Sequence, residues 1–239
     1  MNKTALLGIL LALVVPVICY FIVDHFSGGA VDMPRRYYVD TVITKIEGGK
    51  EITDTVWHKV SNIQLTNQLG NEVSLDDLQG KVIVANFFFT RCPSICPTLT
   101  LNMKRLQNSL RLKDATRKLD TSFVQFLSFS VDPVRDSATQ LKKYADRYGV
   151  NHDVWWMLTG DKKAIYDFAL KEVKLSAIDG EGVDSNFIHT ERFVLLDRDR
   201  VVRGYYNGLD TMAMANLAAD IVKIYVEKDP KKKRSLFRK

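Results

Sequence analysis

A nearly unbroken apolar run, KVIVANFFF at residues 81–89, constrains the fold more than any other stretch of this chain. A strand that is buried on both faces of a sheet has this pattern, because neither face meets water. A second buried strand, SFVQFLSFSV, is predicted at residues 122–131. Between them lies a helical stripe with the spacing i, i+4, i+7 and i+11, formed by Leu99, Met103, Leu106 and Leu110. Strand, helix and strand in this order predict a βαβ unit with parallel strands.

The rest of the chain continues this α/β pattern. YYVDTVITKIE and KEITDTVWHKV flank Gly48-Gly49, which predicts a β-hairpin. A helix is expected from Ser137, which forms a capping box with Gln140, to Gly149. The remaining predictions are a strand at 154–158, a helix at 161–173, two strands around Arg198-Asp199 and a last helix containing Met214, Leu217, Ile221 and Ile224. Together these elements predict one α/β domain.

The N-terminus predicts a membrane anchor. Residues 4–23, TALLGILLALVVPVICYFIV, carry no charge and are long enough to cross a bilayer. Lys3 and the α-amino group precede this stretch and Asp24 follows it, so the positive-inside rule predicts that the rest of the chain lies outside the cytoplasm. The stretch is too long for the apolar core of an ordinary signal peptide, although small residues at 27–29 leave cleavage open. Cys19 lies within it and is interpreted as apolar filling.

The net charge of +6 comes from the C-terminus, which argues against a nucleic-acid-binding surface. Residues 228–239 hold seven basic residues and one acidic residue, so the rest of the chain is balanced. No stripe of Lys and Arg runs through the predicted domain, and we expect no nucleic-acid partner. The basic tail is interpreted as a solvated terminus in preference to a contact with a lipid surface.

The stretch FFFTRCPSICPTLT, residues 87–100, holds Cys92 and Cys96, the two cysteines outside the apolar N-terminus. Each precedes a proline, and a residue before proline avoids the helical region, so we expect Cys96 to lie just before a helix that begins at Pro97. The free N–H groups and the dipole of a helix N-terminus stabilise a thiolate. Thiolates attack disulfides and bind soft metals, so a structural disulfide, thiol–disulfide exchange and a metal site are three alternatives for this pair.

Four motifs resemble the Sco/SenC family: FFFTRCPSICPTLT, FSVDPVRDS at residues 129–137, WWMLTGD, and FIHTERFVLLD with its lone histidine. Members of that family are membrane-anchored, thioredoxin-like copper proteins that serve the assembly of cytochrome c oxidase. The resemblance covers roughly residues 56–227 and implies a thioredoxin-like α/β fold, in which helices flank a central mixed sheet. It also implies a copper ion bound by Cys92, Cys96 and His189. Thr190 stands where the family commonly has serine, and it keeps a hydroxyl.

The chemistry of these side chains agrees with a copper site. Soft thiolates suit Cu(I), and an added imidazole makes the set acceptable to Cu(II) as well. His189 follows a Gly/Asp-rich loop and directly precedes a predicted strand, unlike His25, His58 and His152. Asp132 follows a buried strand and is expected at the sheet edge where ligand sites of α/β proteins form. It is a candidate for orienting the copper ligands, with a turn residue as the alternative.

Several functions compete for the redox pair Cys92 and Cys96. The favoured one is a copper chaperone that delivers copper to the CuA site in subunit II of cytochrome c oxidase, with the pair kept reduced by a periplasmic thiol reductant. The alternative is a thiol–disulfide oxidoreductase that reduces the CuA cysteines and does not need His189, so enzymatic activity is left open. A general thioredoxin-type reductase is disfavoured because residues 134–229 contain no proline, and a peroxiredoxin-like peroxidase because Phe89 stands where threonine is needed. A redox or copper sensor ranks last.

The predicted organisation has four segments. They are a transmembrane signal anchor at residues 1–23, a tether and β-hairpin at 24–55, the thioredoxin-like copper-binding domain at 56–227 and a basic tail at 228–239. The N-terminal anchor, without an Arg- and Ser-rich targeting segment ahead of it, predicts a single-pass protein of the bacterial inner membrane whose domain faces the periplasm.

Overall fold

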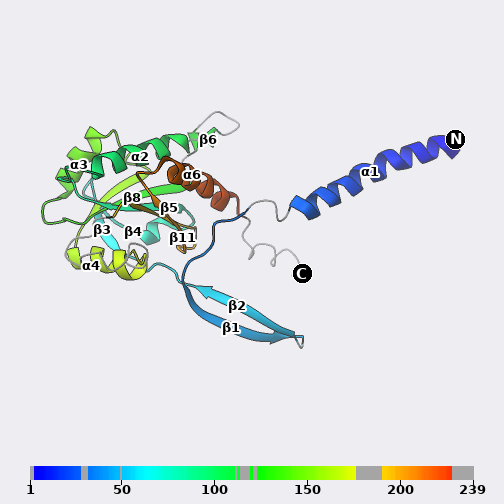
Figure 1. The fold of residues 1–239 in the computed structure, drawn as a ribbon, viewed down its shortest axis with the longest axis horizontal. Helices are drawn as coiled ribbons and strands as arrows, with labels where there is room; N and C mark the ends of the chain where they lie inside the picture. Colours follow the sequence, from blue (N-terminus) through cyan, green and yellow to red (C-terminus); the bar gives the residue numbers. More distant parts are fainter. Residues whose placement is uncertain are drawn as a thin grey trace. The chain divides into compact units, whose positions relative to one another are not determined.

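The computed structural model of the chain describes residues 3–27, 32–48, 50–110, 112–113, 119–120, 123–175 and 190–227. The chain divides into two compact units, Met1–Met33 and Pro34–Lys239. The first unit contains one helix, and the second contains a seven-stranded sheet together with helices and a separate β-hairpin (Figure 1).

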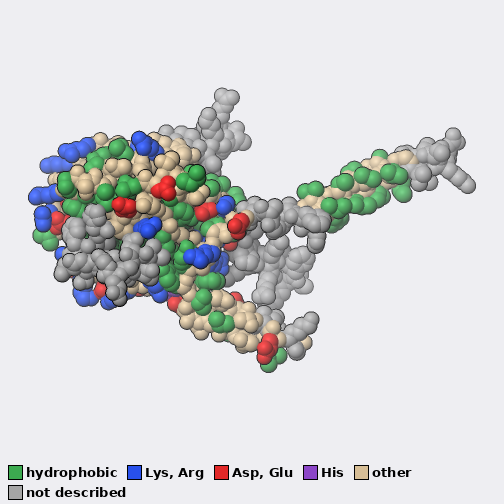
Figure 2. Space-filling model, viewed as in Figure 1, with side chains coloured by type: hydrophobic (Ala, Val, Ile, Leu, Met, Phe, Trp, Pro, Cys, Tyr) green, Lys and Arg blue, Asp and Glu red, His purple; other side chains and the backbone are tan. Residues whose placement is uncertain are grey.

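The first unit is formed by α1 (Lys3–Ser27), a helix of 25 residues with Pro16 inside it. Apolar side chains are exposed along it from Leu10 to Val23, and Figure 2 shows them as a largely hydrophobic surface. In the part of the chain that the structure describes, no helix combines the length and the apolar character needed to cross a membrane. The transmembrane anchor predicted for residues 4–23 stays a prediction.

The central sheet is mixed, with a parallel core and antiparallel edges. The parallel strands are β5 (Val82–Phe88), β8 (Val124–Ser130) and β9 (Trp155–Thr159). Antiparallel pairing adds β10 (Arg192–Leu196) and then β11 (Val202–Asn207) on the β5 side, and β3 (Gln64–Asn67) and then β4 (Glu72–Ser74) on the β9 side. The strand order is β11-β10-β5-β8-β9-β3-β4. The predicted parallel pairing of the two apolar strands is confirmed.

Both faces of the sheet are covered, which explains why β5 and β8 are buried along their whole length. One face carries α2 (Cys96–Ser109), α3 (Ala138–Arg147) and α6 (Thr211–Val226). The other face carries η1 (Leu75–Leu78), α4 (Lys162–Asp167) and the π-helical turn η2 (Phe168–Glu172). Side chains of β5 alternate between these layers, because Val84 and Phe88 pack with the first and Ile83 and Phe87 with the second.

One predicted capping box and one predicted helix start need correction. Ser137 caps α3 by accepting a hydrogen bond from the Gln140 N–H at 3.3 Å, as expected. The Gln140 side chain, however, donates to Thr90 Oγ1 at 3.4 Å instead of completing the predicted capping box. The helix α2 begins at Cys96, one residue before the predicted start, because the Cys96 N–H donates to the Sγ of Cys92 at 3.5 Å and so has a partner.

The predicted β-hairpin is confirmed as β1 (Val39–Glu47) and β2 (Lys50–Trp57), which pair in antiparallel register up to Glu47 opposite Lys50. Gly48 occupies the turn with a φ of 58°, a left-handed conformation that favours glycine. A second, very short antiparallel pair, β6 (Leu112–Lys113) and β7 (Leu119–Asp120), was not predicted. The division between hairpin and domain at residue 56 stays a prediction.

A buried arginine on the sheet holds the first residue of the second unit and the residue that follows α6. The Arg203 side chain on β11 is 2% exposed and donates to the carbonyl of Pro34 at 3.0 and 2.7 Å. It also donates to Asp197 Oδ2 at 3.0 Å and to Glu227 Oε2 at 2.8 Å. A charge taken out of water stabilises the fold only while its partners remain in place. The removal of Arg203 would leave Asp197, itself 5% exposed, with only the longer contact to Arg36 at 3.9 Å as an ion pair among the described residues.

We therefore expect Arg203→Leu to lower the free energy of unfolding by about 3–5 kcal/mol, the range for breaking one side of a buried ion pair. The matched control is Arg200→Leu, because Arg200 pairs at 2.8 Å with Asp76, whose side chain is 49% exposed. That surface pair should contribute about 1 kcal/mol or less. Urea unfolding of both variants measures the difference, and equal losses would contradict this account of Arg203.

Candidate metal centre

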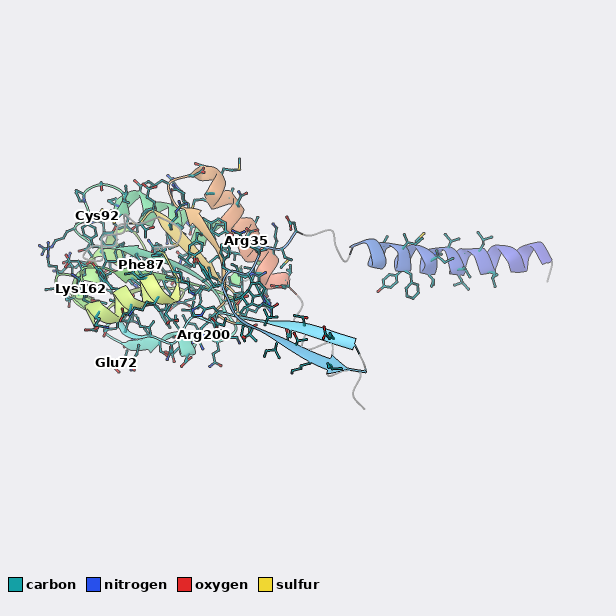
Figure 3. All side chains as sticks on the ribbon, turned by 60° about the horizontal axis from the view of Figure 1, so that its bottom comes forward. Arg35, Glu72, Phe87, Cys92, Lys162 and Arg200 are labelled. Carbon is teal, nitrogen blue, oxygen red and sulfur yellow. The ribbon has the colours of Figure 1, made fainter. Side chains whose placement is uncertain are left out.

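The two cysteines lie where β5 leads into α2. The chain leaves β5 at Phe88, reaches Cys92 through a short turn in which the Cys92 N–H donates to the Phe89 carbonyl at 3.3 Å, and enters α2 at Cys96. Both thiols are free, and the residues are only 6% and 3% exposed. Figure 3 shows Cys92 toward one end of the domain and Phe87 farther inside it. The predicted position of the pair, at a strand end and beside a helix N-terminus, is confirmed.

The Cys92 thiol is held in a polar pocket of its own loop. Burial raises the pKa of Cys92, but hydrogen bonds from the side chain and backbone of Cys96 and from Ser94 outweigh burial, so its pKa lies below the ordinary value of a thiol. The Cys96 N–H reaches the Cys92 Sγ at 3.5 Å, and the Ser94 hydroxyl lies 3.7 Å from it. Hydrogen-bond donors of this kind stabilise a thiolate. Cys92 is therefore the more readily ionised member of the pair.

The Cys96 thiol has the opposite character. Burial, followed by the hydrogen bond with Cys92, raises the pKa of Cys96 to about 12. Thr100 and Tyr144 pack beneath it: the Thr100 hydroxyl donates to the Cys96 carbonyl at 2.8 Å and lies 3.0 Å from the Tyr144 hydroxyl. Cys96 is a protonated thiol at neutral pH. A metal ion that binds both sulfurs must displace the proton of Cys96, so the pair offers one ready thiolate and one that forms on binding.

Asp132 lies at the end of β8, as the sequence predicted. Among the contacts of the described residues, its carboxylate pairs with Arg135 Nε at 3.1 Å, and its carbonyl accepts hydrogen bonds from the N–H groups of Arg135 and Asp136. These contacts are those of a turn that leads from β8 toward α3. They favour the turn role over the role of orienting copper ligands, which stays a prediction.

His189 lies outside the described residues, so its predicted role is untested by the structure. Its neighbour Thr190 is described and 6% exposed, and the Thr190 hydroxyl accepts a hydrogen bond from the Arg192 N–H at 3.1 Å. Since β10 runs antiparallel to β5, with Val194 opposite Ala85, β10 begins beside the end of β5 that leads into the cysteine loop. Within the described ranges, no group of three His, Cys, Asp or Glu side chains is placed to hold a metal ion.

One buried side chain beside the loop was not singled out by the sequence analysis. Asp136 is fully buried and hydrogen-bonded to Thr90 and Ser130. The sequence contained one hint, because Asp136 belongs to the SVDPVRDS stretch that follows a buried strand. A single sequence gives no sign that this carboxylate, rather than that of Asp132, turns inward.

The residues present fit a soft metal ion. Two sulfur donors lie close together at the start of α2, and the lowered pKa of Cys92 favours its thiolate form. Sulfur donors suit soft metal ions, of which Cu(I) is one. The same two thiols also fit thiol–disulfide exchange, with Cys92 as the attacking sulfur. The geometry alone is compatible with both chemistries.

Comparison with known proteins decides the family. The family model described as SCO1/SenC matches residues 55–226. The SCO1 protein homolog of Bacillus subtilis (strain 168) is 37% identical over 175 residues, which cover 73% of this chain and 86% of that protein. A solved structure of BsSco, described as a member of the Sco family of cytochrome c oxidase assembly proteins with a disulfide switch, matches with a TM-score of 0.58 and 36% identity, over 72% of this chain and 96% of that one.

A copper-bound homologue matches as well. The structure of Bradyrhizobium japonicum ScoI with copper bound has a TM-score of 0.51 and 25% identity to this chain, over 70% of this chain and 99% of that one. These matches confirm the thioredoxin-like fold and show that homologues bind copper. The chain belongs to the SCO1/SenC family.

Proposed function

We propose that this chain is a copper chaperone that binds copper through Cys92, Cys96 and His189 and delivers it to the CuA site of cytochrome c oxidase. The observation that carries the proposal is the pair of reduced, buried thiols at the start of α2, with unequal affinities for a proton. The copper-bound Bradyrhizobium homologue and the oxidase-assembly role given to BsSco support it.

Three ligands suit a carrier better than a permanent site. A set of two sulfurs and one imidazole leaves a copper ion with open coordination positions, so the ligands of a receiving protein can replace them one at a time. Cys96 would assist release, because its high proton affinity favours return of a proton when the metal leaves.

The assignment of the third ligand to His189 has topological support. The strand β10 begins beside the end of β5 from which the cysteine loop departs, because the two strands are antiparallel neighbours, and His189 stands three residues before Arg192 in the sequence. His152, by contrast, accepts a hydrogen bond from Gln68 and contacts Asp146, and both partners lie away from the cysteine loop in the sequence.

A thiol–disulfide oxidoreductase that reduces the CuA cysteines is the second candidate. The lowered pKa of Cys92 and the raised pKa of Cys96 suit this function as well, because thiol–disulfide exchange uses an attacking thiolate beside a protonated partner thiol. A redox or copper sensor has no such observation in its favour. Only the chaperone requires His189.

The cellular setting stays a set of predictions. They are anchoring through residues 4–23, a periplasmic location at the bacterial inner membrane, subunit II of cytochrome c oxidase as the receiver and a thiol reductant that keeps the pair reduced. A membrane tether would raise the effective concentration of the carrier near the oxidase.

Copper titration of the reduced chain tests the ligand set. We expect one equivalent of Cu(II) with an intense thiolate-to-copper absorption band, and we expect His189→Ala to lose most of that band because the imidazole completes the set. The matched control is His152→Ala, which should keep it. If the double variant Cys92→Ser/Cys96→Ser binds copper as well as the native chain, or if His189→Ala changes nothing, the chaperone proposal fails and a disulfide-reduction assay follows.

Alkylation by iodoacetamide tests whether the pKa of Cys92 is lower than that of Cys96. The experiment uses a Cys19→Ser background, so that only these two cysteines remain. Only the thiolate reacts, so the alkylation rate rises with pH until the thiol is fully ionised. Because the pKa of Cys92 is lowered, its rate should level off at a lower pH than that of an ordinary thiol. The rate at Cys96 should keep rising toward pH 12. Peptide mass spectrometry at several pH values should find Cys92 modified first. Equal rates in the folded protein, as expected for a urea-unfolded control, would contradict the assigned electrostatics.

A further inference from the structure

A buried carboxylate joins the start of the cysteine loop to the neighbouring strand. Asp136 is 0% exposed and accepts three hydrogen bonds. The donors are the Thr90 N–H at 3.0 Å, the Thr90 hydroxyl at 2.6 Å and the Ser130 hydroxyl at 2.6 Å. Thr90 lies two residues before Cys92, and Ser130 is the last residue of β8. One side chain therefore connects two segments that lie forty residues apart in the sequence, at the sheet edge that holds the thiols.

The surrounding donors are oriented toward this carboxylate. The Ser130 oxygen accepts from the Asp132 N–H at 3.2 Å, and the Thr90 oxygen accepts from the Gln140 side chain at 3.4 Å. Each hydroxyl therefore has its own proton left to donate to Asp136. A carboxyl group supplies only acceptors when ionised, and three donors converging on it make a fully satisfied buried network. Such a network holds its members in one arrangement, because any displaced donor or acceptor would be buried without a partner.

The hydrogen bonds of Asp136 hold residues that follow the end of β5, where pairing with β8 has stopped. The last backbone hydrogen bond between β5 and the segment after β8 runs from the Val131 N–H to the Phe88 carbonyl at 2.9 Å. Beyond it the chain leaves the sheet, and the Thr90 N–H finds its acceptor in Asp136. The next backbone contact, from Cys92 N–H to the Phe89 carbonyl at 3.3 Å, depends on where residues 89 and 90 are held.

We propose that Asp136 is a positioning residue for the metal-binding thiols: by holding Thr90 against the end of β8, it sets where Cys92 lies relative to the first turn of α2. It touches neither thiol and acts through Thr90. The placement of Cys92 stands on the contacts above, and its consequence for copper rests on the proposed function.

Asp136→Asn is the direct test, because asparagine keeps the shape and removes one acceptor from the network. The first readout is the ratio of alkylation rates of Cys92 and Cys96 at one fixed pH, which needs no metal. We expect this ratio to fall several-fold in the variant. The second readout is the affinity for copper. Substitution of a residue that supports the metal ligands typically weakens metal binding by roughly 10–100-fold. We expect a loss of copper affinity near the lower end of that range and a shifted thiolate-to-copper band.

Two further variants and a control separate positioning from stability. Thr90→Val removes the hydroxyl and keeps the backbone N–H, and Ser130→Ala removes one donor, so both should change the ratio in the same direction and by less. Ile165→Val is the control, since Ile165 is fully buried in α4 on the opposite face of the sheet and belongs to the other core layer. It should lower the melting temperature and leave the alkylation ratio and the copper band unchanged.

The outcomes are distinct. If Asp136→Asn lowers the melting temperature while the alkylation ratio and the copper band match the native chain, Asp136 is merely structural and the inference is wrong. If Asp136→Asn does not fold, an unchanged ratio in both Thr90→Val and Ser130→Ala overturns it equally. If the native chain binds no copper, the proposed function fails, and the alkylation ratio still decides whether Asp136 positions Cys92.

Discussion

The burial of β5 and β8 on both faces of the sheet is the constraint on which the rest of this structure depends. Neither strand has a face in water, so a side chain that must meet a ligand from solution lies where the chain leaves them. Because the two strands are parallel neighbours, they release the chain at the same edge, one into the cysteine loop and the other into the turn that contains Asp136. The topology of the sheet therefore places the thiols and the Asp136 carboxylate, which is hydrogen-bonded to Thr90 in the same loop, at the same ends of neighbouring strands.

At that edge, two chemically identical side chains acquire different properties. Cys92 accepts hydrogen bonds from Cys96 and Ser94, which lower its pKa, whereas burial raises the pKa of Cys96. The difference serves both candidate functions. A carrier gains one sulfur ready to capture copper and one that can take a proton on release, and a reductase gains an attacking thiolate beside a protonated partner. The third ligand, not the thiol pair, distinguishes the two.

Two buried polar side chains hold distant segments of the chain together. Asp136 accepts three hydrogen bonds beside the cysteine loop, and Arg203 binds Asp197, Glu227 and the Pro34 carbonyl. Each has several partners, and a buried polar group with its partners in place favours one arrangement of the chain. Asp136 holds the start of the cysteine loop, and Arg203 holds Pro34 and the residue that follows α6 against the sheet.

The sequence by itself determined the elements whose signals are local. The apolar run at residues 81–89, the glycine turn of the hairpin, the Ser137 cap and the paired cysteines depend on residues close together in the chain. The family resemblance added the mixed sheet, which the structure has, and a copper site with His189, which stays a prediction. Only the tertiary structure decided the contacts that join distant segments. Three features depend on which side chains meet after folding: the different pKa values of the two thiols, the hydrogen bonds of Asp136 with Thr90, and the contacts of Arg203. Hydrogen bonds between residues forty or more positions apart produce no periodic pattern in a single sequence.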